Sequence, residues 1–232
     1  MFDSTLILIP AHNETASVAT IIKAARRETD CAILVVDDAS SDNTAHIAKQ
    51  AGAQVLKLPV QLGAWGAAQT GIRYALGQGY KSIITMDADG QHEAKDLKRL
   101  FYPIIEGKAD VSIGACISRG SKLRKLAWVF LKWASGLSME DITSGFRAYN
   151  QKAMFLLASK ESTLLEYQDI GVLTQLRAHN LQIVEVPVKM LPRSDGHSRV
   201  FNSWIAVGYY MFQASILGLS KRHRKHPSRK KS

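Results

Sequence analysis

Short apolar runs alternate with helical segments through the first half of the chain, and this alternation limits the folds open to it. Residues 5–10 and 32–36 contain almost no polar side chain, so each predicts a strand buried on both faces of a sheet. Between them, residues 17–29 carry apolar side chains at helical spacing, with Ser17 at the position of an N-cap. Further strands are predicted over 54–58, 82–85 and 110–113, and further helices over 43–51, 64–76 and 93–106. The pattern predicts βαβ units and therefore an α/β fold: a doubly wound, mostly parallel sheet with helices on both faces.

Polar loops follow several of these predicted strands. Ligands of doubly wound sheets bind beyond the carboxyl ends of the strands, which meet at one edge of the sheet. At those ends the sequence has residues 11–14, the pair Asp37 and Asp38, and residues 87–89. Loops with acidic side chains that converge on one edge predict a binding site there.

Asp87 and Asp89 directly follow the predicted strand 82–85. In an extended segment alternate side chains share a face, so both carboxylates would point toward one ion, and Gln91 could add an amide oxygen. Such hard oxygen ligands suit Mg²⁺ or Mn²⁺, which take their remaining ligands from water and substrate phosphate. The alternative is a polar turn that binds nothing, because Asp-Gly pairs are common in loops.

Size and cysteine usage restrict the class of protein. At 232 residues and 46% hydrophobic composition, the chain is long enough for one substantial domain, which we expect over residues 1–200. Cys31 and Cys116 belong to no Cys/His cluster, which argues against a disulfide scaffold or a zinc module and favours a reducing compartment. The sequence has neither a dinucleotide-binding glycine motif nor a P-loop, and its first residues do not resemble a secretory signal.

The second half of the chain has features of a membrane-associated protein. Residues 123–137 have the pattern of a basic amphipathic helix, which would lie in a bilayer interface or pack on the sheet. Residues 201–220 carry no charge and predict an amphipathic, interfacial helical segment, with a packed or dimer-contact helix or a membrane span as alternatives. Residues 221–232 form a basic tail that is expected to be disordered, in contact with solvent, anionic lipid or nucleic acid. Together these segments favour a cytoplasmic protein that is peripheral on the cytoplasmic face of the membrane.

Several motifs, in order along the chain, carry a resemblance to a known family: residues 9–14, 36–44, 87–92, 141–147, 185–187 and 193–199. With them the chain resembles the family 2 glycosyltransferases, and within that family the dolichyl-phosphate mannose synthase and polyprenyl-phosphate glycosyltransferase branch. The resemblance extends over roughly residues 5–200. It implies a GT-A type fold, a nucleoside diphosphate sugar as donor, a polyprenyl phosphate as acceptor, and Mg²⁺ or Mn²⁺ as cofactor.

The resemblance, together with the arginines of the second half, also suggests roles for individual residues. The donor pocket would include Pro10, His12, Glu14, Asp87 and the pair Asp37 and Asp38, of which either could make the direct contact. The metal would be held by Asp87, Asp89 and Gln91. Catalysis is expected to involve Asp89, Arg119, Ser144, Arg147, Asp169 and Arg193. The acceptor phosphate would be bound by Arg119, Arg124, Ser144, Arg193, Ser198 and Arg199, because the planar guanidinium matches phosphate oxygens two at a time.

The function predicted from these features is metal-dependent, inverting transfer of a hexose, mannose or glucose, to a dolichyl or undecaprenyl phosphate. One alternative keeps the fold but uses a hydroxyl acceptor, which would need a general base such as Asp169, Glu166 or Asp141. A second alternative is a non-catalytic module that binds nucleic acid or an anionic membrane through the basic end. The acidic loops argue against nucleic acid as a partner, since they repel phosphate unless a metal intervenes. A homodimer is compatible with the sequence.

Overall fold

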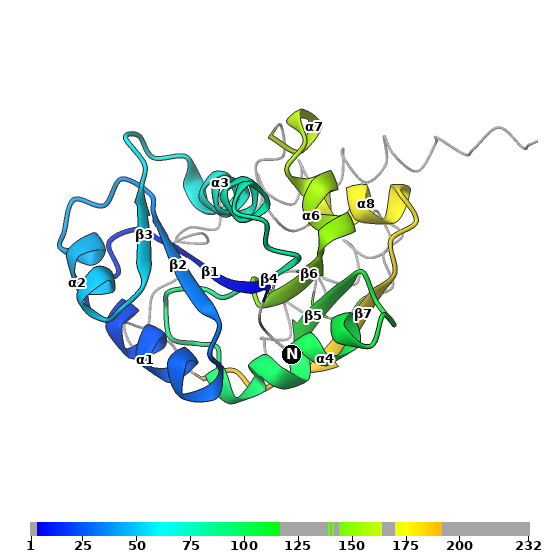
Figure 1. The fold of residues 1–232 in the computed structure, drawn as a ribbon, viewed down its shortest axis with the longest axis horizontal. Coiled ribbons are helices and arrows are strands. Elements are labelled where there is room, and N and C mark those ends of the chain that lie inside the picture. The colour runs from blue at the N-terminus through cyan, green and yellow to red at the C-terminus, as the bar shows by residue number, and fades with distance from the viewer. Residues whose placement is uncertain (1–3, 117–138, 140, 142–143, 164–169, 192–232) are drawn as a thin grey trace, which may run out of the picture. The chain divides into compact units, whose positions relative to one another are not determined.

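The computed structural model describes residues 4–116, 139, 141, 144–163 and 170–191. They contain a seven-stranded sheet of order β3-β2-β1-β4-β6-β5-β7 (Figure 1). The strands are β1 (Thr5–Ala11), β2 (Ala32–Asp37), β3 (Gln54–Lys57), β4 (Ser82–Thr85), β5 (Val111–Ala115), β6 (Arg147–Asn150) and β7 (Ile183–Pro187). All neighbouring strands pair in parallel except β6, which is antiparallel to both β4 and β5. The predicted mostly parallel sheet is therefore confirmed.

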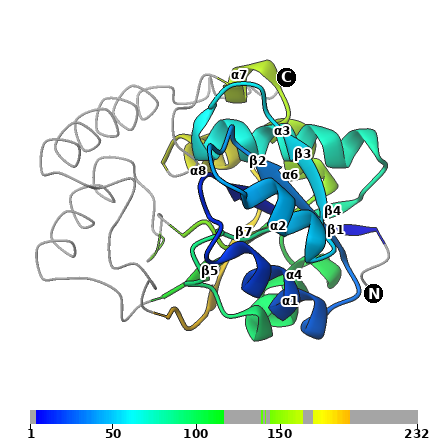
Figure 2. The same cartoon turned by 90° about the vertical axis from the view of Figure 1, so that its left-hand side faces the viewer.

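Helices cover both faces of this sheet, as predicted. One face carries α1 (Val18–Glu28), α2 (Thr44–Gln50) and α4 (Leu97–Ile105), which follows the short 3-10 helix η1 (Ala94–Asp96). The other face carries α3 (Gly63–Gly77), α6 (Gln151–Leu157), α7 (Lys160–Thr163) and α8 (Ile170–Ala178). A view turned by 90° shows α3 on one side of the sheet and α1 and α4 on the other (Figure 2). The doubly wound arrangement follows from these positions.

The main differences from the predicted elements lie in the second half of the described chain. The single helix expected over 93–106 is divided into η1 and α4. The strand β6 was not predicted, because its sequence Arg-Ala-Tyr-Asn has no apolar alternation. It forms because β4 and β5 pair with it on both sides, so its backbone hydrogen bonds come from tertiary contacts and not from local preference.

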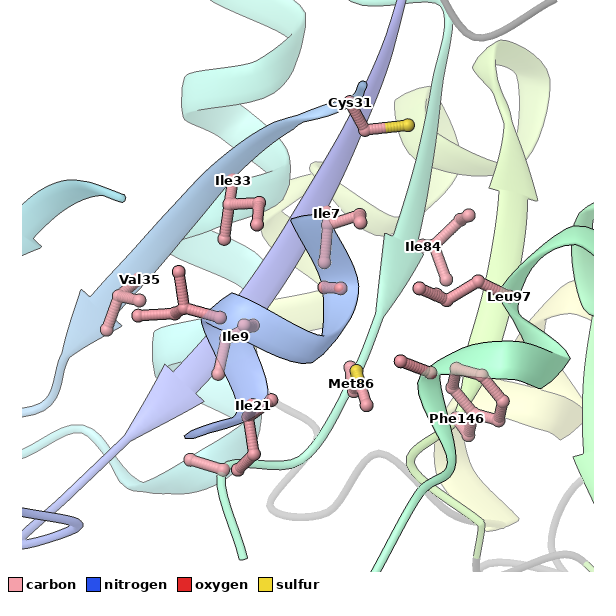
Figure 3. Packing of buried hydrophobic residues seen from close by; sticks show 14 of the residues in the cluster. Ile7, Ile9, Ile21, Cys31, Ile33, Val35, Ile84, Met86, Leu97 and Phe146 are labelled. Atoms are coloured by element: carbon pink, nitrogen blue, oxygen red, sulfur yellow. The ribbon is translucent and has the colours of Figure 1, made fainter. Parts of the chain in front are cut away.

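The hydrophobic core on the α1 and α4 face reaches the carboxyl edge of the sheet. Ile7 and Ile9 of β1 pack with Ile84 of β4, and Met86 and Phe146 belong to the same cluster (Figure 3). Each fully buried side chain of this size stabilises the fold by about 1.5–3 kcal/mol. Because Met86 directly precedes Asp87 and Phe146 directly follows Gly145, the core anchors the segments that form the edge.

The described residues bear on some of the other predictions about the chain's organisation, and the rest lie outside them. Cys31 and Cys116 are both buried and unbridged, as expected for a chain without a disulfide scaffold. Within the residues that the structure describes, no helix has the length and apolar character needed to span a bilayer. The expected segments 123–137, 201–220 and 221–232, and the domain boundary at 200, lie outside the described residues.

Candidate active site

Three loops meet where β1, β2 and β4 end. Because these strands are parallel neighbours, their carboxyl ends lie at one edge of the sheet, which confirms the expected convergence. The backbone N–H of Asp38 donates to the carbonyl of Ala11 at 2.8 Å, and that of Met86 donates to the carbonyl of Leu8 at 3.0 Å. Pro10 lies on β1, opposite Val36 of β2. The loops are therefore held together by the sheet itself.

His12 and Asn13 join the first two loops. The carbonyl oxygen of Asp38 can only accept, so Nδ1 of His12 carries a proton and donates to it at 2.7 Å. Asn13 accepts from the backbone N–H of Ser41 through Oδ1 at 2.9 Å, and its Nδ2 lies 3.2 Å from Nε2 of His12. Asn13 has a positive φ of 54°, which asparagine tolerates better than most residues. Both ring nitrogens of His12 thus take part in holding these loops together.

The two aspartates after β2 have different surroundings. Asp38 accepts two backbone hydrogen bonds at the start of α3, from Leu62 at 2.7 Å and from Gly63 at 2.9 Å. The Asp37 side chain is also buried, yet neither of its carboxylate oxygens has a hydrogen-bond partner among the residues that the structure describes. Burying a carboxylate without a hydrogen-bond donor is unfavourable in free energy, so a ligand that donated to Asp37 would remove this penalty. Asp38 therefore fixes the start of α3, and no such contact occupies Asp37 among the described residues.

The segment after β4 is a turn and not an extended strand. β4 ends at Thr85, a turn forms at Ala88 and Asp89, and Gly90 has a φ of 77°. Asp89 folds back, so that its Oδ1 accepts from the backbone N–H of Gln91 at 3.0 Å. The expectation that Asp87 and Asp89 share the face of an extended segment was wrong, because the glycine and this local hydrogen bond reverse the chain. The carboxylates are positioned by the turn, and we name residues 87–92 the acidic turn.

Two neighbouring segments hold the acidic turn in place. The hydroxyl of Ser17 lies 2.6 Å from the carbonyl of Ala88 and 3.0 Å from Oε2 of Glu14. The side chain of Gln91 donates through Nε2 to the carbonyl of Leu191 at 3.3 Å, and the backbone carbonyl of Gln91 accepts from the backbone N–H of Leu191 at 2.9 Å. Ser17 occupies the expected N-cap position of α1, but its side chain makes no capping bond there. Its hydroxyl instead connects the first loop to the turn.

Asp87 lies against the segment that leads into β6. A Cβ added at Gly145 would lie 2.4 Å from Oδ1 of Asp87 and 2.6 Å from its Oδ2, so only glycine leaves room for the carboxylate. Gly145 is held by a hydrogen bond from the Thr85 hydroxyl to its carbonyl at 2.8 Å. On the other side, Nε2 of His92 donates to Oδ2 of Asp87 at 3.0 Å. Sequence patterns do not predict this contact of His92, because it depends on the fold.

The acidic turn has the donor chemistry of a Mg²⁺ or Mn²⁺ site. Among residues 4–116, 139, 141, 144–163 and 170–191, no group of three or more His, Cys, Asp or Glu side chains could hold a metal. That result excludes a closed protein cage there, but Mg²⁺ is usually held by one or two carboxylates and completed by water and phosphate. Asp87 and Asp89 are carboxylates of this kind, and the missing side chain of Gly145 leaves room for the Asp87 carboxylate at this edge.

The predicted site residues of the 141–147 motif that the structure describes are buried. The side chain of Arg147 is fully buried, and its Nε donates to the carbonyl of Ser144 at 2.7 Å. Ser144 is 1% exposed, and its hydroxyl accepts from the backbone N–H of Phe146 at 3.3 Å. Asp141 is also buried and accepts from the backbone N–H of Cys116 at 3.3 Å. In this arrangement Arg147 supports the backbone of its own motif.

The remaining predicted site residues lie outside the described residues. They are Arg119, Arg124, Glu166, Asp169, Arg193, Ser198 and Arg199. Their proposed roles in catalysis and in acceptor binding stay predictions.

Comparison with known proteins assigns the chain to a family. A family model described as glycosyl transferase family 2 matches residues 6–158. An undecaprenyl-phosphate mannosyltransferase of Micrococcus luteus is 30% identical over 239 residues, with 94% of this chain and 95% of that protein covered. A polyprenol monophosphomannose synthase of Mycolicibacterium smegmatis is 28% identical over 239 residues, with 94% of this chain and 88% of that protein covered.

A solved structure extends the comparison to the fold. The crystal structure of glucosyl-3-phosphoglycerate synthase from Mycobacterium tuberculosis, in complex with Mn²⁺, uridine diphosphate and glucosyl-3-phosphoglycerate, matches with a TM-score of 0.73 at 19% identity. The match covers 94% of this chain and 79% of that chain. At this identity the likeness concerns the fold alone, and it confirms the expected GT-A type. The chain therefore belongs to glycosyl transferase family 2 and is a glycosyltransferase, similar to members of the polyprenyl-phosphate branch.

Proposed function

We propose that this glycosyltransferase moves a hexose from a nucleoside diphosphate sugar to a polyprenyl phosphate, with inversion at the sugar and with Mg²⁺ or Mn²⁺ as cofactor. The named relatives support the acceptor class, since two of them are a polyprenol monophosphomannose synthase and an undecaprenyl-phosphate mannosyltransferase that match over nearly their whole length. Their names favour mannose over glucose as the sugar. The protein would work as a peripheral enzyme on the cytoplasmic face of a membrane, where lipid phosphates are displayed.

The buried, unpartnered carboxylate of Asp37 is the observation that carries the donor half of the proposal. Uracil and guanine each present a ring N–H beside a carbonyl, and such an N–H is the donor that Asp37 lacks. Asp38 is not the base contact in this proposal, because both of its oxygens accept from the start of α3. His12 and Asn13 contribute by holding the two loops around the base in one geometry.

The acidic turn would serve the diphosphate. A bound divalent cation there would neutralise the negative charge that develops on the leaving nucleoside diphosphate as the sugar bond breaks. Asp87 and Asp89 would hold that cation, and Ser17 and Gln91 would keep the turn in place through their bonds to Ala88 and Leu191. No protein acid is needed for departure, since the leaving group is already a stable anion.

The acceptor half of the proposal requires positive charge and no general base. A lipid phosphate is anionic at neutral pH and can attack the sugar carbon directly, whereas a hydroxyl would need a base. Among the candidate bases, Asp141 is buried and hydrogen-bonded to Cys116, which argues against its use as a mobile proton acceptor. We assign the binding of the acceptor phosphate to Arg119, Arg124, Arg193, Ser198 and Arg199, as expected from their positions in the sequence.

The experiment is a transfer assay on the full chain in detergent, with Mn²⁺, a short polyprenyl phosphate and a panel of GDP- and UDP-linked hexoses. We expect one donor to give a lipid-linked sugar of inverted anomeric configuration, with EDTA and Asp89→Asn each abolishing transfer. Asp30→Asn is the matched control, because Asp30 is exposed and precedes β2 at the opposite edge of the sheet. Transfer only to hydroxyl acceptors would refute the lipid-phosphate assignment, and full activity of Asp89→Asn would refute the assigned metal site.

A further inference from the structure

His92 is a buried imidazole directly after the two acidic residues of the turn. Its side chain has no exposed area, and its ring stacks on Phe146 with centroids 4.9 Å apart and an interplanar angle of 23°. Its backbone forms an antiparallel bridge with Met190. The bridge therefore fixes the backbone of His92, and the stack on Phe146 fixes its ring.

The hydrogen bonding of this ring is one-sided. Nε2 lies 3.0 Å from Oδ2 of Asp87, and because a carboxylate oxygen only accepts, Nε2 carries the proton. Nδ1 is buried and has no hydrogen-bond partner in the described part of the chain. Burying a polar nitrogen without a partner is unfavourable, so an apolar ring would pack against Phe146 at lower cost. The benefit that offsets this cost is the bond to Asp87.

The Asp87 carboxylate lies between His92, which donates a hydrogen bond to it, and Gly145, which leaves room for it. The side chain of Asp87 is 39% exposed at the edge of the sheet, whereas the His92 side chain that donates to it has no exposed area. Gly145 provides the space on the other side, since any Cβ there would overlap both carboxylate oxygens. The carboxylate has little freedom to rotate between these neighbours.

We propose that His92 is a positioning residue that holds the Asp87 carboxylate ready for the divalent cation. This inference rests on the proposed function, because it takes Asp87 as a cation ligand. Nε2–H fixes Oδ2, the stack on Phe146 fixes the ring, and the bridge to Met190 fixes the backbone beneath it. Hydrogen-bonding partners of metal ligands orient those ligands, and their loss weakens metal affinity by about 10–100-fold.

The test is Mn²⁺ binding to the full chain without any nucleotide, measured from the electron paramagnetic resonance signal of free Mn²⁺. His92→Phe keeps an aromatic ring to stack on Phe146 but cannot donate, so we expect the Kd to rise by about 10-fold or more. His92→Gln keeps an N–H donor at a similar distance from the backbone, and it should restore most of the affinity. Ile72→Val is the control for a general loss of packing, because Ile72 is buried in α3 on the other face of the sheet. It should lower the melting temperature and leave the Kd unchanged.

Two further measurements separate the possible failures. If Asp87→Asn also binds Mn²⁺ like the parent chain, Asp87 is no ligand and the assigned metal site fails. If Asp87→Asn weakens binding but a folded His92→Phe does not, the site stands and the role of His92 is refuted. For the case in which His92→Phe does not fold, nitrogen-15 histidine spectra of the parent chain should show a protonated Nε2 whose resonance shifts when Mg²⁺ is added. An unprotonated Nε2, or an Nε2 resonance that does not shift when Mg²⁺ is added, would overturn the proposal.

Discussion

Replacing Gly145 with alanine tests whether the position of the Asp87 carboxylate controls metal binding. The new Cβ would lie 2.4 Å from Oδ1 and 2.6 Å from Oδ2 of Asp87, whereas unstrained contacts of this kind are about 3.5 Å. The carboxylate must therefore move by about 1 Å, since the backbone of Gly145 is held by Thr85. The φ of Gly145 is not in the left-handed region, so the alanine brings no backbone strain of its own.

A shift of this size exceeds what a metal site tolerates. Metal–ligand distances are defined to within about 0.2 Å, and a misplacement of 1 Å at a reacting centre can reduce the rate about 100-fold. The same movement would break the 3.0 Å hydrogen bond between Asp87 and His92. We therefore expect Gly145→Ala to weaken Mn²⁺ binding by about 10–100-fold and to lower the rate of transfer at subsaturating Mn²⁺ still further.

The assay is a Mn²⁺ titration followed both by direct binding and by the initial rate of sugar transfer. Gly77→Ala is a matched control, because a Cβ at Gly77 meets no atom within 4 Å. It should leave both curves unchanged. If Gly145→Ala is folded and both its Mn²⁺ Kd and its rate equal those of the parent chain, the carboxylate is not positioned by this contact and the reasoning is wrong.

Two other predictions follow from carboxylates at the same edge. Asp37→Asn should weaken nucleotide binding about 10-fold or more, measured by calorimetry, and leave Mn²⁺ binding unchanged, because a neutral amide accepts less strongly from a base N–H. Burial alone would raise the pKa of Asp42, but hydrogen bonds from Thr15 and Thr44 outweigh it and lower the pKa from 3.8 to about 2. This carboxylate therefore stabilises the fold fully above pH 4, and the contribution is lost as the pH falls toward 2. Urea unfolding of Asp42→Asn should show a smaller loss of stability over that range than the parent chain, and an equal loss would contradict the assignment.

The sequence was sufficient to predict most of the sheet because β1, β2 and β4 are buried on both faces. Strands in that position must be apolar throughout, so their sequences are distinctive, and the predicted range 82–85 is the observed β4. The convergence of the acidic loops followed from the parallel order alone. Neither result required knowledge of any contact between distant residues.

The features that the sequence could not predict are those that depend on distant partners. Asp37 and Asp38 are adjacent and both acidic, and what separates them is a pair of backbone N–H groups at Leu62 and Gly63. The sequence around residue 38 does not predict that the start of α3 will lie beside it. The same holds for β6, which becomes a strand only because β4 and β5 supply its partners.

The contacts of His92 also depend on the unpredicted strand β6. The neighbours of His92 in sequence mark a polar turn, but its ring contacts Phe146, which precedes the unpredicted strand β6. Phe146 and Gly145 reach Asp87 only because β6 pairs with β4, with Arg147 opposite Thr85. The antiparallel strand β6 thus places the segment that contains Gly145 and Phe146 against the acidic turn, and the geometry of the turn depends on this pairing. It follows that a substitution that disturbs the pairing of β6 should weaken metal binding even where it changes no acidic residue.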